Sequence, residues 1–236
     1  MSISTPKQIP FRFQLDSDAS FANFFVAAKN AAAVYALKNQ LEPAGEEVIY
    51  LWGAEGVGRS HLLQAAAHYA IEHDASAIYI PLSDVLSFAA ADILENLELQ
   101  NIICLDELDS IGGNPDWEQA LFHFYNRVRD SGHRLLLAAA VPPNEIKVQL
   151  ADLKSRLTWG VTFHLHPLSD EEKVQALQLR GAERGIEVTS EVANYILHRS
   201  ARGINDLFKR LEELDDASLA EQRKLTIPFV KQTFGW

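Results

Sequence analysis

The chain has 236 residues, 47% of them hydrophobic, which is enough for one α/β core and a small second domain. Its formal net charge of −11 repels phosphate backbones, which argues against duplex DNA as the main ligand but leaves room for a locally positive nucleotide site. A single cysteine excludes a disulfide framework, residues 1–10 lack a signal core, and residues 135–143 are too few to span a bilayer, so we expect a cytoplasmic protein.

The first part of the chain is predicted to be a tail followed by a helix. Residues 1–18 contain Pro6 and Pro10 and show no helical period, so they are interpreted as a flexible tail. Residues 26–41 are rich in alanine and predict a helix, which Pro43 and Gly45 end.

From residue 48 to residue 165, strand patterns alternate with helix patterns. Short apolar runs predict strands, and the segments between them predict helices. Such alternation implies right-handed crossovers, a parallel sheet and a three-layer α/β core. The predicted strands are 48–52, 77–80, 101–105, 134–141 and 161–165, and the predicted helices are 60–73, 83–97, 116–131 and one or two within 145–157.

After Pro167 the strand patterns stop and only helices are predicted. Ser169 and Glu172 have the spacing of a capping box at the start of the first helix. We therefore expect an α/β domain over 19–167 and a small all-helical lid over 168–236. The predicted lid helices are 169–184, 190–200, 205–219 and 227–234.

Residues 53–60, GAEGVGRS, follow a predicted strand and open a predicted helix, which is the setting of a phosphate-binding P-loop. Glycines let backbone N–H groups surround an anion, and the helix N-terminus adds a favourable dipole. Ser60 is expected to place its hydroxyl on Mg²⁺, while Arg59 stands where lysine is usual and fits the phosphates less compactly. The alternative is a plain glycine-rich turn. The expected phosphate-binding residues are Gly53, Glu55, Gly56, Val57, Gly58, Arg59, Ser60 and His61.

The predicted strand at 102–105 ends in two acids, Asp106 and Glu107, about fifty residues after the glycine-rich loop. This order predicts that Asp106 holds Mg²⁺ and that Glu107 is a candidate for orienting an attacking water. An apolar strand ending in acids is common by itself, so the interpretation depends on the neighbouring loop.

Four blocks together resemble the DnaA-related family of AAA+ proteins, and within it most closely the Hda group of regulatory inactivators. The resemblance covers nearly the whole chain, and the arginine of the glycine-rich loop is part of it. The blocks are SFANFF at 20–25, GRSHLL at 58–63, DLKSRLTWG at 152–160 and QRKLTIPFVK at 222–231.

The resemblance implies a regulator of replication initiation that binds ADP or ATP with Mg²⁺ and stimulates ATP hydrolysis by the initiator DnaA. Arg156 corresponds to an arginine finger, whose guanidinium neutralises charge on the transferring phosphoryl group of the partner's ATP. The ordinary alternative is an exposed surface arginine. An AAA+ homodimer or higher assembly is a further expectation from the resemblance.

Two segments depart from the pattern of an active AAA+ ATPase. Residues 138–141, AAAV, carry no polar group at the strand end that should read the γ-phosphate. In the lid, Asn205 holds the place of a sensor arginine, with Arg202 three residues earlier as a candidate substitute. We therefore expect preference for ADP and weak hydrolysis by the chain alone, although Glu107 argues for some activity.

Aromatic residues before the loop are expected on the adenine side of the nucleotide, namely Phe21, Phe24 and Phe25. Packing in the core is the competing interpretation, since aromatic residues at this spacing usually pack against their own domain.

The tail segment QIPFRF at 8–13 loosely resembles the motif with which the Hda group binds the sliding clamp of DNA polymerase III. Alternate apolar side chains of an extended peptide can enter pockets while glutamine supplies hydrogen bonds. A tail that packs on its own domain is the alternative. The expected clamp-binding residues are Gln8, Ile9, Phe11 and Phe13.

Three functions remain open from the sequence: a regulator that activates its partner, a self-sufficient ATPase such as a helicase loader, and a DnaA-like DNA-binding initiator. The chain ends at Trp236 without a helix-turn-helix pattern, so we expect contact with DNA to be indirect. His164 and His166 are the closest histidine pair and lack metal-ligand spacing, so no structural metal is expected.

Overall fold

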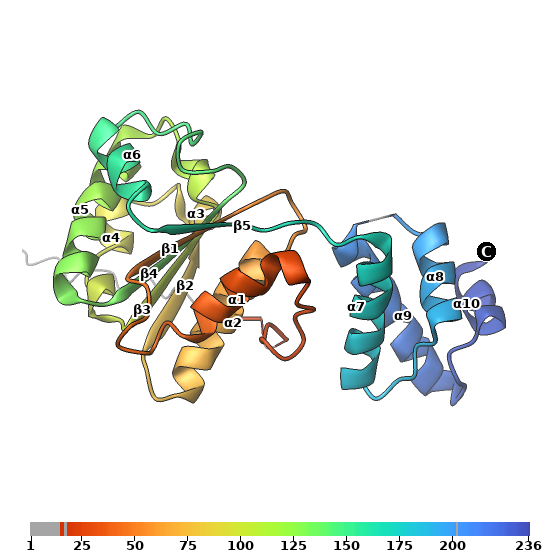
Figure 1. The fold of residues 1–236 in the computed structure, drawn as a ribbon. Helices are drawn as coiled ribbons and strands as arrows, with labels where there is room; N and C mark the ends of the chain where they lie inside the picture. The colour runs from red at the N-terminus through yellow and green to blue at the C-terminus, as the bar shows by residue number, and fades with distance from the viewer. Residues whose placement is uncertain (1–14, 17, 202) are drawn as a thin grey trace, which may run out of the picture.

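The computed structural model describes residues 15, 16, 18–201 and 203–236 as an α/β part followed by a helical part (Figure 1). The predicted clamp-binding residues Gln8, Ile9, Phe11 and Phe13 and the candidate sensor Arg202 lie outside the described residues. No helix among the described residues combines the length and the apolar character that crossing a membrane requires.

Five parallel strands form one sheet with the order β2-β3-β4-β1-β5. The strands are β1 (Val48–Trp52), β2 (Ala77–Pro81), β3 (Ile102–Asp106), β4 (Arg134–Ala139) and β5 (Val161–His164). Parallel pairing brings the carboxyl ends of β1, β3 and β4 to the same edge, where ligands bind in open α/β sheets. The parallel α/β sheet expected from the alternating pattern is confirmed.

Helices cover both faces of the sheet (Figure 1). One face packs against α1 (Ala31–Lys38) and α2 (Arg59–Glu72), which the 3-10 helix η1 (Ala28–Asn30) precedes. The other face packs against α3 (Leu82–Val85), α4 (Ala90–Ile93), α5 (Pro115–Ser131) and α6 (Ala151–Leu157), with the 3-10 helices η2 (Leu97–Leu99) and η3 (Leu108–Ile111).

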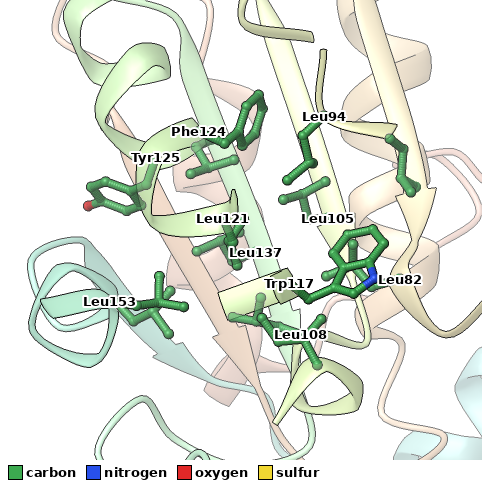
Figure 2. Packing of buried hydrophobic residues seen from close by; sticks show 14 of the residues in the cluster. Leu82, Leu94, Leu105, Leu108, Trp117, Leu121, Phe124, Tyr125, Leu137 and Leu153 are labelled. Atoms are coloured by element: carbon green, nitrogen blue, oxygen red, sulfur yellow. The ribbon is translucent and has the colours of Figure 1, made fainter. Parts of the chain in front are cut away.

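The α5 face carries the larger side chains of the core. Trp117, Phe124 and Tyr125 of α5 are buried against strand residues such as Leu105 and Leu137 (Figure 2). On the α2 face the core side chains are smaller, because α2 presents several alanines to the sheet. Cys104 of β3 is fully buried there, and burial raises the pKa of its thiol.

The single helix predicted over 83–97 is wrong, because the chain forms α3, α4 and η2 separated by short non-helical links. Val85 and Ala90 are both buried in the same core cluster. Five residues apart, they would lie about 140° apart around one continuous helix, whereas the break lets both face the same core. Ala89 adopts an extended conformation and breaks the segment there.

Four helices form the C-terminal part: α7 (Asp170–Glu183), α8 (Ser190–Arg199), α9 (Ile204–Glu221) and α10 (Ile227–Phe234). Ser169 and Glu172 complete the capping box predicted for α7, with Ser169 accepting a hydrogen bond from the Glu172 N–H and Glu172 accepting one from the Ser169 N–H. These helices have a hydrophobic core of their own around Leu177, Leu211 and Phe229.

Candidate functional site

The glycine-rich loop joins β1 to α2, as the sequence predicts. Gly58 has a φ of +95°, and a Cβ added there would lie 2.6 Å from Phe24 Cε2. A Cβ at Gly53 would lie 2.5 Å from the carbonyl oxygen of Leu165. Both positions therefore require glycine, and the loop passes between the aromatic segment before β1 and the chain after β5.

Arg59 opens α2 directly behind the loop. Its Nη1 atom is buried and has no hydrogen-bond partner in the part of the chain that the structure describes. Burial raises the pKa of the nearby Tyr50, the Asp109 carboxylate raises it further, and the positive charge of Arg59 opposes the rise. A buried guanidinium nitrogen without a partner is costly, and it fits a site that receives an anion.

Ser60 of the loop and Asp106 of β3 meet at the hydroxyl of Tyr79 on β2. The Tyr79 hydroxyl donates a 2.8 Å hydrogen bond to Asp106 Oδ2, and Asp106 is buried. Burial and then Asp106 raise the pKa of Tyr79, while a hydrogen bond with Ser60 opposes the rise. A serine hydroxyl beside a buried carboxylate supplies the hard oxygen donors that Mg²⁺ prefers, so these residues fit the predicted metal ligands.

Glu107 follows Asp106 in a left-handed conformation, with a φ of +55°. Its backbone N–H donates to Asp106 Oδ1 at 2.8 Å, and its exposed carboxylate accepts a hydrogen bond from the Ser83 hydroxyl. The two acids therefore point to different partners, one toward Tyr79 and Ser60 and the other toward Ser83.

A cavity lies between the loop and the lid helices. Its walls come from the segment before β1, the loop with the first turn of α2, and α7 and α9 of the lid. The lining residues are Asn23, Phe24, Phe25, Glu55, Gly56, Val57, Gly58, His61, Pro167, Leu168, Lys173, Ala176, Arg180, Gly203, Ile204, Asn205 and Phe208.

Among the three aromatic residues predicted for the adenine side, Phe24 and Phe25 line this cavity. Phe21 instead packs against α1 and α2, with its ring 5.8 Å from Tyr69 and 5.4 Å from the ammonium of Lys38. The apolar half of the cavity is therefore formed by Phe24 and Phe25 with lid residues.

His61 connects the loop to the aromatic segment. Its Nε2 lies 2.9 Å from the carbonyl oxygen of Ser20, and its ring lies 5.5 Å from that of Phe24. Burial lowers the pKa of His61, which favours the neutral imidazole near pH 7. The ring therefore helps to hold Phe24 over Gly58.

The lid contributes two cations that sequence reasoning missed, Lys173 and Arg180. The Lys173 ammonium lies 3.3 Å from Asp170, and the Arg180 guanidinium lies 3.1 Å from Asp18. With Ala176 they have the i, i+3, i+7 spacing of one helix face, which is the signal that would have found them. Asn205, the residue in the sensor position, lines the cavity as well.

At the carboxyl end of β4, where a polar sensor was expected, the polar side chain comes from another element. Residues 138–140 are alanines, and the Ala140 N–H donates a 2.8 Å hydrogen bond to Asp109 Oδ1 of η3. A carboxylate therefore lies at the strand end where the sequence predicts the absence of a γ-phosphate sensor.

Arg156 lies in the last turn of α6, on the α5 face of the sheet. Its Nε donates a 3.1 Å hydrogen bond to Asn126 Oδ1, and its guanidinium lies 4.0 Å from the Trp159 ring, which is 56% exposed. No carboxylate among the described residues forms an ion pair with it. Arg156 therefore lies beside an exposed tryptophan and outside any ion pair with the described carboxylates.

Comparison with protein families assigns both parts of the chain. Residues 15–164 match the bacterial DnaA ATPase domain, and residues 170–234 match the lid domain of Hda. These matches confirm the resemblance that the four sequence blocks predict.

Solved structures agree with this fold. Domain III of the replication initiation protein DnaA from Thermotoga maritima has a TM-score of 0.77 and 22% identity, over 93% of this chain and 96% of that one. AMPPCP-bound DnaA from Aquifex aeolicus has a TM-score of 0.72 and 22% identity, over 84% and 65%. The RuvB Holliday junction branch migration motor of Thermotoga maritima has a TM-score of 0.66 and 18% identity, over 92% and 71%.

Proposed function

Because this chain belongs to the DnaA-related family of AAA+ proteins and carries an Hda-type lid, we propose that it is a nucleotide-binding regulator of replication initiation. It binds ADP or ATP in the cavity between the glycine-rich loop and the lid. It then presents Arg156 to ATP held by the initiator DnaA, with the sliding clamp as its tether to DNA.

The buried Nη1 of Arg59, which lacks a partner among the described residues, supports phosphate binding. In this proposal the loop N–H groups and Arg59 hold the phosphates, while Phe24 and Phe25 cover the base. Ser60 and Asp106 hold Mg²⁺, which would screen phosphate charge when bound. The solved Aquifex aeolicus DnaA contains AMPPCP, which is consistent with a nucleotide in the same place.

The observation that carries the regulatory role is the position of Arg156. Its helix α6 packs on the α5 face of the sheet, while α1 and α2 cover the opposite face (Figure 1). The cavity is lined by the aromatic segment, the loop and the lid, and neither Arg156 nor any other residue of α6 belongs to its lining. A charge placed there serves a triphosphate held by another molecule, and the adjoining Trp159 adds an exposed anchor of the type enriched at interfaces.

We expect Arg156→Ala to abolish the stimulation of DnaA's ATP hydrolysis and to leave ADP binding unchanged. An arginine finger contributes about 10³–10⁵ in rate in other nucleotide hydrolases, so the loss should exceed about a hundredfold. The measurement is ATP turnover by DnaA with the DNA-loaded clamp present.

Arg129→Ala is the matched control, because the Arg129 guanidinium also lies over Trp159, at 5.5 Å, but belongs to α5. It should retain most of the stimulation. Undiminished stimulation by the Arg156 variant would exclude the finger role.

A self-sufficient ATPase is the second candidate, favoured by the exposed Glu107 beside the buried Asp106. The carboxylate of Asp109 at the end of β4 disfavours a third phosphate and argues for slow hydrolysis. Turnover by the chain without DnaA separates the two functions.

A further inference from the structure

A strap formed by residues 15, 16 and 18–23 joins the α/β part to the lid. The Asp16 N–H donates a 2.7 Å hydrogen bond to Gln64 Oε1, and His68 Nε2 lies 3.0 Å from the Asp16 carbonyl oxygen, so the strap is held on α2. Two residues later, Asp18 Oδ2 accepts from Arg180 at 3.1 Å and from Arg184 at 3.4 Å, both on α7. In Figure 1 this red segment runs between α2 and α7.

The two arginines that hold Asp18 differ in one respect. Arg184 pairs with Asp18, Glu212 and Asp215, and it does not line the cavity. Arg180 lines the cavity, and its side chain is only 13% exposed. Its Nε is buried without a hydrogen-bond partner among the described residues. The Nη2 of Arg180 contacts Asp18 and, at 3.7 Å, Glu212, so Arg180 keeps one unmet donor at Nε, whereas Arg184 reaches three carboxylates.

The other polar lid groups in the cavity are less suited to an anion. Asn205 carries no charge, and the Lys173 ammonium is paired with Asp170 at 3.3 Å within its own helix. The loop residues Gly56 and Gly58 and the first-turn residue His61 line the same cavity, and the charge of Arg180 acts on His61. Arg180 is thus a lid cation that lines the same cavity as the phosphate-binding loop and has an Nε donor without a partner among the described residues.

We propose that Arg180 binds the phosphate chain of the nucleotide, and that Asp18 is its counter-ion, which the phosphates displace. The inference rests on the proposed nucleotide site and adds to it a ligand from the lid and a competitor from the strap. Bound nucleotide then weakens the hold of Asp18 on the lid, so nucleotide binding in the cavity is transmitted to this strap.

Charge and exposure favour this exchange. The Asp18 side chain is half exposed, and ion pairs at such positions contribute little to stability. A phosphate chain offers several charged oxygens, and hydrogen bonds from a guanidinium to phosphate are roughly twice as strong as neutral ones. The contacts that Arg180 gains with the phosphate oxygens therefore outweigh the contact with Asp18 that it loses.

The test is calorimetry with MgADP and, separately, adenosine on Arg180→Ala, with Arg184→Ala as the matched control. We expect Arg180→Ala to weaken ADP binding at least about tenfold without changing adenosine binding, since one charged contact is worth about 1.4 kcal/mol or more. Arg184→Ala should stay within about twofold of the parent, because it lies outside the cavity lining. Equal ADP affinity in the two variants overturns the inference.

Asp18→Asn gives a second, independent readout that does not depend on how well an Arg180 variant folds. It should tighten ADP binding about threefold in the parent and leave it unchanged in the Arg180→Ala background, since the coupling runs through that pair. A weakened affinity, or an equal gain in both backgrounds, excludes the counter-ion role. A parent that does not bind ADP at all would refute the proposed function itself, which is a different outcome.

Discussion

Single residues at the carboxyl edge of the sheet set the charge that a nucleotide would meet. Arg59 brings a buried guanidinium nitrogen without a partner in the described part of the chain, and Asp109 brings a carboxylate held by the Ala140 N–H. Both act on the buried hydroxyl of Tyr50, in opposite directions. The proposed site therefore combines a buried positive charge at Arg59 with a negative charge at the end of β4.

We expect Asp109→Asn to raise the affinity for ATP relative to ADP about tenfold. Removing one negative charge near a third phosphate is worth about 1 kcal/mol in water and more near a protein surface. The asparagine oxygen can still accept the Ala140 N–H, so the fold should be retained. Calorimetry with both nucleotides measures the ratio.

Asp92→Asn, on the exposed side of α4, is the control for a general change in net charge. It should leave the ratio unchanged. If Asp109→Asn gives the same ratio as Asp92→Asn, Asp109 plays no part in discriminating the third phosphate.

Site residues that belong to a local sequence motif could be predicted from the sequence. Site residues that are brought together only by folding could not. Ser60 and Asp106 follow from the loop and from the strand that ends in acids. Tyr79, which joins them, comes from β2 and has no signature of its own. Asp18 and Arg180 are 162 positions apart in the chain, and only the packing of the strap against α7 brings them together.

At the scale of elements, α6 is held by a residue of α5. Glu118 is 2% exposed, and its Oε2 accepts hydrogen bonds from the N–H groups of Gln149 and Leu150 at 2.9 Å and 2.7 Å. Its Oε1 accepts a third from Gly113 at 2.9 Å. Leu150 is the N-cap of α6 and has no side-chain cap of its own, so Glu118 serves that end of the helix.

We expect Glu118→Ala to lower the free energy of unfolding by about 3 kcal/mol, because it leaves three backbone N–H groups without their acceptor. It should also reduce stimulation of DnaA, since Arg156 lies at the other end of α6, while ADP affinity changes little. Urea unfolding and ATP turnover measure the two effects.

Asp116→Ala is the control, since Asp116 is an exposed carboxylate in the first turn of the same helix. It should cost less than about 1 kcal/mol, the usual size of a helix-dipole interaction. Equal unfolding free energies for the two variants would mean that Glu118 does not anchor α6.

Most strands and helices could be predicted from the periodicity of their apolar residues, because that periodicity reflects the side of each element that is buried in a core. The strands and the four lid helices lie close to the expected positions. The segment over 83–97 could not be predicted, since its buried residues follow the shape of the strand ends rather than one helical stripe.

At the scale of the whole molecule, three regions of proposed function lie on different parts of the fold. The cavity faces the lid, α6 with Arg156 covers the opposite face of the sheet from α1 and α2, and the strap links α2 to α7. The acidic net charge of −11 is compatible with reaching DNA through a protein partner. Association of copies of the chain remains a prediction from the family resemblance.

We expect Gln8→Ala to reduce retention of the protein on immobilised sliding clamp, because the glutamine amide would supply hydrogen bonds beside the pockets for apolar side chains. A pull-down against the parent measures retention. Gln14→Ala, in the same tail but outside residues 8–13, is the control and should behave as the parent. Equal retention of both variants would remove the clamp from the proposed partners.

The buried thiol of Cys104 on β3 can report how often the α/β part opens. The chain contains one cysteine, it lies between α2 and the sheet, and burial keeps it protonated and inert. An alkylating reagent can reach it only when the sheet and α2 separate, so the labelling rate counts openings of the whole α/β part. Any ligand that holds the first turn of α2 should lower the labelling rate of Cys104. The labelling rate therefore reports the occupancy of the ligand without an attached dye.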